Sequence, residues 1–373
     1  MLFIDRWEAF EQAFGEYNYG ALLEDAVTLM RDGAGVGIHV IVTGDKSLAR
    51  NKYASTTEHR LVLRCNDRGD YSSVGLSARD LPESIPDGRA YVGGEGTELQ
   101  FALLCDDPQG GAQAQELSNI AAFTTRRTPP GTSPAPMRVD VLPDQLTFAE
   151  TERYLTHPPR PLWGLVGVGG NELTALGADL AETPTFLISG PPKSGRSSLL
   201  LSMAQSLLIG GTELLLVTPR SSALGALRGH PGVPAVLDMA DPKLGDLHKA
   251  LGRFEGETAV VMVDDAELLL HNDIGKEFTR IARGMVGEGW GIVAAGTNEA
   301  LQGGFSAWHV HLKRNRMGAL LSPQAPVDGE VLGLRLPKGV PSSRLTPGTA
   351  YLHLGDGQIR QVKVPLPHGV SPS

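Results

Sequence analysis

Short runs of consecutive apolar residues alternate with helix-like segments in the second half of the chain. The runs cover residues 186–189, 214–217, 259–263 and 292–295. Between the first two, Leu199, Leu200, Met203 and Leu207 recur at helical spacing, and Gly210-Gly211 ends the segment. Continuous apolar strands connected by helices are typical of a parallel sheet that helices cover on both faces. The pattern predicts an α/β fold with a parallel sheet.

The chain divides into three regions. Its 373 residues are enough for about two domains at roughly 150 residues each. Residues 1–118 alternate strand-like and helix-like patterns, residues 119–140 are rich in Pro and Thr and predict a linker, and residues 141–373 form a second unit.

Three landmarks of the first region recur in the second, in the same order and at similar spacing. The first landmark is an apolar strand ending in aspartate, at 2–5 and again at 262–265. The second is a Gly-x-Gly segment, at 35–38 and 289–292, and the third is a turn before Ala, at 86–90 and 347–350. A single Gly-x-Gly match means little, but three ordered matches favour duplication over chance. The first copy begins at its aspartate strand and lacks a phosphate loop. We therefore expect strand 2–4 to lack the phosphate-loop strand beside it.

A glycine-rich loop lies between the predicted strand 186–189 and the helix that follows. It fits the pattern G-x-x-x-x-G-K-[ST] except at one position, and it consists of Gly190, Pro191, Pro192, Lys193, Ser194, Gly195, Arg196, Ser197 and Ser198. In such a loop, backbone N–H groups surround phosphate at the positive end of the helix dipole. The Ser197 hydroxyl is the expected Mg²⁺ ligand. The alternative interpretation is an ordinary Gly/Ser turn with a capped helix.

Arg196 occupies the position where the pattern has lysine. Lysine offers phosphate a compact point charge, whereas arginine is a wide planar fork on a longer stem. The positive charge is kept, but its fit inside the loop changes, so we expect weakened or altered catalysis. Lys193 adds a second positive charge from within the loop.

Two aspartates follow the apolar run 259–263. Ligands of open α/β sheets bind at the carboxyl ends of the strands, where Asp264 and Asp265 stand. Asp264 is the expected Mg²⁺ ligand and Asp265 the residue that polarises the attacking water. The alternative is a buried strand that ends in a solvated acidic turn.

Thr297 and Asn298 end the next apolar run. Asn298 is a candidate sensor of the nucleotide γ-phosphate, or else these two residues form a helix cap.

Composition limits the possible partners. A net charge of −9 excludes a generally basic nucleic-acid coat, so any DNA contact needs a local patch. One basic cluster contains His309, His311, Lys313, Arg314 and Arg316, and its alternation suggests a strand. It is either a surface facing DNA or a neighbouring subunit, or a solvated strand face. Zinc is not expected there, because neither a Cys nor a third His accompanies the pair.

Other sequence features concern the compartment. No apolar stretch is long enough to span a membrane. Two cysteines in so long a chain favour a reducing cytosol, so we expect a cytoplasmic protein, with any membrane association coming through a partner or an upstream region.

The strand 186–189, the loop 190–197 and the Asp264-Asp265 strand resemble the FtsK/SpoIIIE group of P-loop ATPases. The lead-in 161–167, with Asp179 ahead of the phosphate strand, resembles the same group, and residues 3–10, 37–43 and 60–64 are similar to the C-terminal half of such a domain. Actinobacterial members carry tandem ATPase domains and include DNA translocases and type VII secretion ATPases. The resemblance implies a RecA-like core that binds ATP with Mg²⁺ and assembles in rings. It also implies that the first copy is truncated.

Two functions follow from this resemblance. One is a motor that hydrolyses ATP to move DNA or a secreted protein. The other is a catalytically weak module that binds nucleotide, peptide or a partner, as some type VII secretion domains do. Arg196 and the absent first phosphate loop favour the second function, and the motif ancestry favours the first. Arg60, Arg64, Arg314 and Arg316 are the candidates for an arginine finger.

Overall fold

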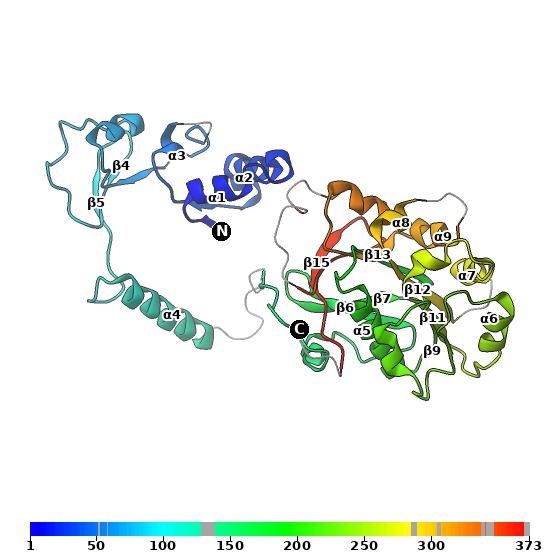
Figure 1. Cartoon of the computed structure of the whole chain (residues 1–373). Coiled ribbons are helices and arrows are strands. Elements are labelled where there is room, and N and C mark those ends of the chain that lie inside the picture. The colour runs from blue at the N-terminus through cyan, green and yellow to red at the C-terminus, as the bar shows by residue number, and fades with distance from the viewer. Residues whose placement is uncertain are drawn as a thin grey trace. The chain divides into compact units, whose positions relative to one another are not determined.

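The computed structural model describes residues 1–50, 53–57, 59–127, 139–284, 289–303, 307–336, 340 and 347–368. The chain forms two compact units, Met1–Pro136 and Met137–Ser373. Figure 1 shows both units along the chain, and each is described by itself below.

The second unit contains a large sheet surrounded by helices. Its strands are β6 (Trp163–Gly169), β7 (Thr174–Asp179), β8 (Thr185–Ser189), β9 (Glu213–Val217), β10 (Ala235–Leu237), β11 (Ala259–Val263), β12 (Trp290–Gly296), β13 (Met317–Leu321), β14 (Thr349–Leu354) and β15 (Ile359–Lys363). Its α-helices are α5 (Arg196–Ile209), α6 (Leu244–Leu251), α7 (Gly275–Ala282), α8 (Asn298–Gln302) and α9 (His309–Arg314). Its 3₁₀ helices are η4 (Ala149–Tyr154), η5 (Ala223–Leu227), η6 (Ala266–Leu269) and η7 (Pro326–Leu332).

The sheet of the second unit is mixed. Its strand order is β10-β9-β11-β12-β8-β13-β14-β15-β6-β7. The pairs from β10 to β13 are parallel, and those from β13 to β7 are antiparallel. All four predicted strands lie in the parallel part. The prediction of a parallel sheet is therefore right for that part and wrong for the rest, where β14 joins β15 and β6 joins β7 through short turns.

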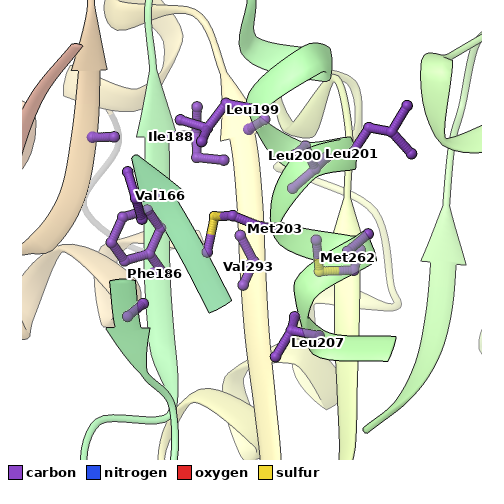
Figure 2. Close-up of a cluster of buried hydrophobic side chains, with 14 of the residues drawn as sticks. Val166, Phe186, Ile188, Leu199, Leu200, Leu201, Met203, Leu207, Met262 and Val293 are labelled. Atoms are coloured by element: carbon purple, nitrogen blue, oxygen red, sulfur yellow. The ribbon is translucent and has the colours of Figure 1, made fainter. Parts of the chain in front are cut away.

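Two apolar cores lie on the two faces of this sheet. On one face, α5 packs through Leu199, Leu200, Met203 and Leu207 against strand residues such as Val293. Figure 2 shows these side chains between α5 and strands β8, β11 and β12. On the other face, α6, α7 and α9 enclose a second core that includes Phe278. The central strands are covered on both sides, which explains their unbroken apolar sequences.

The first unit contains two small sheets and several short helices. Its strands are β1 (Leu2–Ile4), β2 (Val40–Val42), β3 (Leu61–Leu63), β4 (Arg89–Val92) and β5 (Glu98–Gln100). Its helices are α1 (Trp7–Phe14), η1 (Tyr17–Gly20), α2 (Ala21–Asp32), η2 (Gly33–Val36), α3 (Ser47–Arg50), η3 (Arg68–Val74) and α4 (Gly110–Arg127). Strands β1 and β2 pair in parallel, and β3, β4 and β5 form an antiparallel sheet.

Each small sheet of the first unit has its own core. Ile4 and Val42 pack with residues of α1 and α2, such as Trp7 and Leu23. Val62 of β3 packs with Tyr71 and Tyr91.

Helix α4 occupies the first part of the segment predicted as a linker. It spans residues 119–127 of that segment, and residues 128–138 lie outside the described part of the chain. None of the helix residues is buried.

We predict that Leu200→Ala lowers the free energy of unfolding of the second unit by about 3 kcal/mol, because its side chain is fully buried beneath α5. The matched control is Ile209→Ala in the same helix, where the side chain is 59% exposed. We expect that change to cost about 0.5 kcal/mol or less. Urea unfolding followed by tryptophan fluorescence measures both; equal losses would contradict the assigned core.

Candidate functional site

The loop from Gly190 to Gly195 joins β8 to α5 in a tight conformation. Lys193 has a φ of 65° and Gly195 a φ of 98°, both in the left-handed region. A Cβ on Gly190 would lie 2.5 Å from the Ser194 Oγ and 2.9 Å from the Leu321 Cβ, so only glycine fits there. The conformation of the loop is therefore fixed by close packing at the carboxyl end of β8, unlike that of a loose turn.

The loop presents polar groups without protein partners. In the part of the chain that the structure describes, the backbone N–H groups of residues 195–198 have no protein acceptor, as expected for the first turn of a helix. The Ser194 Oγ is buried and has no hydrogen-bond partner among the described residues. An array of free donors at a helix N-terminus suits an anion such as phosphate.

The Arg196 side chain turns toward two carboxylates. Its guanidinium lies 3.5 Å from the Asp265 Oδ1 and 3.4 Å from the Glu267 Oε1, and only 11% of the side chain is exposed. Ion pairs in a partly desolvated position are stronger than ion pairs on an open surface. The positive charge of the loop is therefore neutralised by the chain itself.

Asp264 is buried at the end of β11. The Ser222 hydroxyl donates to its Oδ2 at 2.6 Å, and the Asp265 N–H donates to its Oδ1 at 3.0 Å. Its exposed fraction is 2%. Both carboxylate oxygens are thus oriented by hydrogen bonds.

Asp265 stands in a strained and electrostatically unfavourable position. Its φ of 48° is in the left-handed region, which costs energy for a residue with a Cβ. Burial, followed by the nearby charges of Asp264 and Glu267, raises its pKa above the ordinary 3.8, and Arg196 only partly offsets these effects. Strain and a raised pKa at the edge of the sheet are features of functional sites.

Glu267 is a site residue that the sequence analysis missed. Its Oε2 accepts the Thr297 N–H at 3.3 Å, and its Oε1 contacts Arg196. It links the phosphate-loop helix to the end of β12. The signal in the sequence was its place three residues after Asp264, the same spacing as Glu8 after Asp5.

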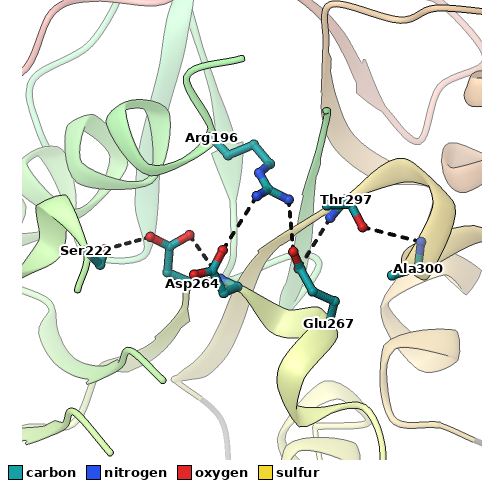
Figure 3. A network of polar contacts seen from close by, with 7 residues as sticks. Arg196, Ser222, Asp264, Glu267, Thr297 and Ala300 are labelled. Carbon is teal, nitrogen blue, oxygen red and sulfur yellow. Dashed lines mark hydrogen bonds and ion pairs between the residues drawn. The ribbon is translucent and has the colours of Figure 1, made fainter. Parts of the chain in front are cut away.

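Together these contacts form one continuous polar network. It runs from Ser222 through the two aspartates to Arg196, then through Glu267 to Thr297 (Figure 3). Four segments that are distant in sequence meet here at the carboxyl edge of parallel strands. This is the edge where open α/β sheets bind ligands.

Thr297 and Asn298 have different positions. Thr297 caps α8, because its Oγ1 accepts the Ala300 N–H at 3.4 Å. Asn298 is buried, and its Oδ1 accepts a hydrogen bond from the Ser189 hydroxyl at the end of β8. Asn298 therefore lies beside Ser189, the residue that precedes the phosphate loop.

The basic cluster differs from its prediction. Residues 309–314 form helix α9 and not a strand. His309 is buried, and its Nε2 contacts the Gly303 carbonyl at 2.9 Å, while the Lys313 Nζ donates to the Gln302 carbonyl at 3.0 Å. Two of the five side chains are thus engaged inside the protein. A DNA-facing surface gains no support from this cluster.

The predicted Mg²⁺ ligands come from two elements of the site. Ser197 lies in the first turn of α5, and Asp264 ends β11. A single carboxylate with a hydroxyl suits Mg²⁺, which keeps several waters and takes its remaining ligands from substrate phosphates. The described ranges contain no group of three or more His, Cys, Asp or Glu residues that could hold a metal ion. None of the helices described here is long and apolar enough to cross a membrane.

No protein-family model matches the chain, and no curated protein matches it by sequence. Solved structures do match it. EssC (ATPases 2 and 3) from Geobacillus thermodenitrificans matches with a TM-score of 0.61 at 16% identity, over 98% of this chain and 71% of that chain. Thermomonospora curvata EccC (ATPases 2 and 3), in complex with a signal sequence peptide, matches with a TM-score of 0.58 at 18% identity, over 98% and 68%. This chain shares the fold of those ATPase domains.

A third match is the cytoplasmic domain of the Thermomonospora curvata type VII secretion ATPase EccC. Its TM-score is 0.55 at 18% identity, over 98% of this chain and 44% of that chain. The predicted resemblance to FtsK/SpoIIIE-like P-loop ATPases is thus confirmed at the level of the fold.

The raised pKa of Asp265 predicts a pH-dependent stability. An aspartate whose folded pKa exceeds its unfolded value destabilises the fold at neutral pH, and this cost disappears as the pH falls through the folded pKa toward 3.8. Asp265→Asn, which resembles the neutral form, should therefore raise the thermal midpoint at pH 7 and lose this advantage near pH 4.

Asp356 is the control, because its pKa is shifted in the opposite direction. Its hydrogen bond with Arg360 lowers its pKa to about 2, so it stabilises the fold above pH 3.8. Asp356→Asn should lower the midpoint at pH 7. If both variants shift the midpoint in the same direction, the electrostatic assignment of Asp265 is wrong.

Proposed function

We propose that the second unit is a nucleotide-binding module that takes ATP with Mg²⁺ at the loop 190–198 and hydrolyses it slowly. The observation that carries this proposal is the pairing of Arg196 with Asp265 and Glu267. The loop has the free N–H donors that phosphate needs. Its cationic side chain, Arg196 at the lysine position of the pattern, is however held by two carboxylates of the same site.

The side chains have distinct roles in this proposal. The backbone N–H groups of residues 195–198 bind phosphate oxygens, and Lys193 adds charge from the exposed side of the loop. Ser197 and Asp264 hold Mg²⁺, which supplies neutralisation of the phosphate charge when bound. Asp265 orients the attacking water, and Asn298 responds to the γ-phosphate. Glu267 positions Arg196.

Nucleotide binding has an energetic cost that is specific to this site. To contact phosphate, Arg196 must leave two carboxylates, and Asp265 and Glu267 then remain as charges beside the polyphosphate. Removing one partner from a desolvated ion pair is costly. Affinity should accordingly be modest, and hydrolysis slow, which favours the binding module over a fast motor.

We further propose that this module belongs to a type VII secretion-like ATPase that acts on protein at the cytoplasmic side of a membrane. The EccC structure that matches the chain was solved with a signal sequence peptide. The net charge of −9 and the buried His309 argue against DNA as the substrate. Assembly with other ATPase subunits in a ring is part of the proposal.

We also infer that the first unit is a partial copy of the second. Both have a parallel strand pair in the same register relative to their aspartates, with Ile4 opposite Val42 and Val263 opposite Ala294. This register aligns Gly37 with Gly289, two positions away from the alignment that the sequence suggested.

The residues that follow the two aspartates also correspond. Arg6 has a φ of 58° and Asp265 a φ of 48°, so both copies turn through the same left-handed conformation. A glutamate comes two residues later in each, Glu8 and Glu267.

The antiparallel strands agree in register as well. Leu63 lies opposite Ala90 in the first unit, and Leu321 lies opposite Ala350 in the second. The three correspondences extend over the whole of the proposed repeat.

We predict that the full chain binds Mg-ATP at a single site and that Arg196→Lys raises its affinity several-fold. A compact ammonium suits the loop and is less firmly held by two carboxylates. Isothermal titration calorimetry measures both the number of sites and the affinity. The control is Arg228→Lys, which makes the same change at an exposed pair with Asp238. An unchanged affinity in the loop variant would reject Arg196 as the limiting group.

Glu267→Gln should also increase ATP affinity, because it removes one of the two negative charges that hold Arg196. We expect a gain of several-fold, measured by the same calorimetry. Glu299→Gln removes a charge of the same kind from the exposed start of α8 and should have no effect. Reduced affinity in Glu267→Gln would instead assign Glu267 a direct role in binding the nucleotide.

A further inference from the structure

The two small sheets of the first unit leave large apolar side chains exposed. Six of them lie within its strands or directly after a strand, with exposed fractions between 38% and 67%: Phe3, Ile41, Leu61, Leu63, Leu99 and Phe101. We call these six residues the open face. Strand residues of this kind are normally buried, and an exposed group of them marks an interaction surface.

The second unit shows what such residues contact when the fold is complete. By the strand registers, the six positions correspond to Met262, Val293, Ala319, Leu321, Val362 and Val364. All six belong to the core beneath α5, and none is more than 7% exposed. The correspondence is one to one.

Two elements cover those positions in the second unit. Strand β8 lies between β12 and β13 and pairs in parallel with both. Helix α5 then packs across the strands, as Figure 2 shows for Met203 and Leu207 beside Val293 and Met262. In the first unit, β2 pairs only with β1 and β3 only with β4 within the described residues. We call the position between β2 and β3, which β8 occupies in the second unit, the slot. The strand next to the slot is therefore β2, and not β1 as the sequence suggested.

The opposite face of the first unit is already complete. Ile4 and Val42 contact α1 and α2, and Val62 contacts Tyr71. Their counterparts Val263, Ala294 and Leu320 belong to the other core of the second unit. Among its described residues, the first unit thus lacks cover on one side only, and two strand edges there leave their hydrogen-bonding groups open to another strand.

We propose that the open face binds the amino-terminal half of a P-loop domain, and that a strand of this partner half enters between β2 and β3 with its following helix over the open face. This rests on the proposed repeat and not on ATP binding. The partner strand runs parallel to β2 and β3 and is apolar on both faces. Its helix supplies the apolar side that α5 supplies in the second unit. The completed unit would place Asp5 where Asp264 stands.

The test uses the full chain with Cys65→Ser, Cys105→Ser and Ile41→Cys. The probe is a polypeptide of residues 139–258 of this same sequence with Phe186→Cys, since it contains β8 and α5 and no other cysteine. Val293 lies opposite Phe186 in the second unit, so Ile41 should lie opposite Phe186 of the probe. We expect a disulfide-linked heterodimer on mild oxidation, read on a non-reducing gel without nucleotide.

Two further variants make the result specific. Leu61→Glu, on the other side of the slot, should abolish the cross-link. Val36→Cys in place of Ile41→Cys keeps an exposed cysteine outside the slot and should give no heterodimer. Because no nucleotide is used, a failure of the proposed ATP binding leaves this measurement unaffected.

Three results would overturn the proposal. The first is a disulfide between two copies of the chain at Ile41→Cys, which would assign the open face to self-association. The second is protection of that cysteine from maleimide in the chain alone, lifted by deleting residues 110–127, which would assign it to α4. The third is a freely reactive cysteine with no cross-link to the probe.

Discussion

The central constraint of this fold is that a parallel strand must be covered on both faces and paired on both edges. In the second unit, β8 satisfies this constraint for its neighbours, because it joins the strands β11 and β12 to the antiparallel strands from β13 onward. It also ends at Ser189, the residue before the phosphate loop. The strand that holds the sheet together is therefore the strand that positions the site. A unit without a counterpart of β8 loses sheet continuity and the loop together.

Negative charge is concentrated at the carboxyl ends of the same parallel strands. Three carboxylates lie within the network, and one guanidinium faces two of them. The hydroxyl of half-buried Ser222 and the backbone N–H of Asp265 orient Asp264, so hydrogen bonds offset the cost of burying this carboxylate. Asp265 has less compensation, and its raised pKa reflects this. The excess of carboxylates over positive charges beside this loop, rather than its shape, distinguishes it from an ordinary helix start.

The sequence identified the elements whose signal is local. Strands β8, β9, β11 and β12 were predictable because each is a continuous apolar run between polar turns. Helix α9 was not, since the alternation in His309-Val310-His311-Leu312 also places His309 and Leu312 on one helical face, where both are buried. The contact of Arg196 with Glu267 joins residues 71 positions apart, so no local pattern indicates it. The same holds for the open face, which becomes visible only when the registers of two distant strand pairs are compared.

Arginine at the loop position fits the acidic partners that surround it. A lysine ammonium is a single point charge, whereas a guanidinium presents separate N–H groups that reach two carboxylates at once. In this structure those groups reach Asp265 and Glu267, which come from the same turn after β11. Burial, followed by the charges of Asp264 and Glu267, raises the pKa of Asp265, and the Arg196 guanidinium acts in the opposite direction. The Arg196 side chain therefore stabilises the acidic turn in the absence of nucleotide, and any ligand phosphate must compete with that turn for the same charge.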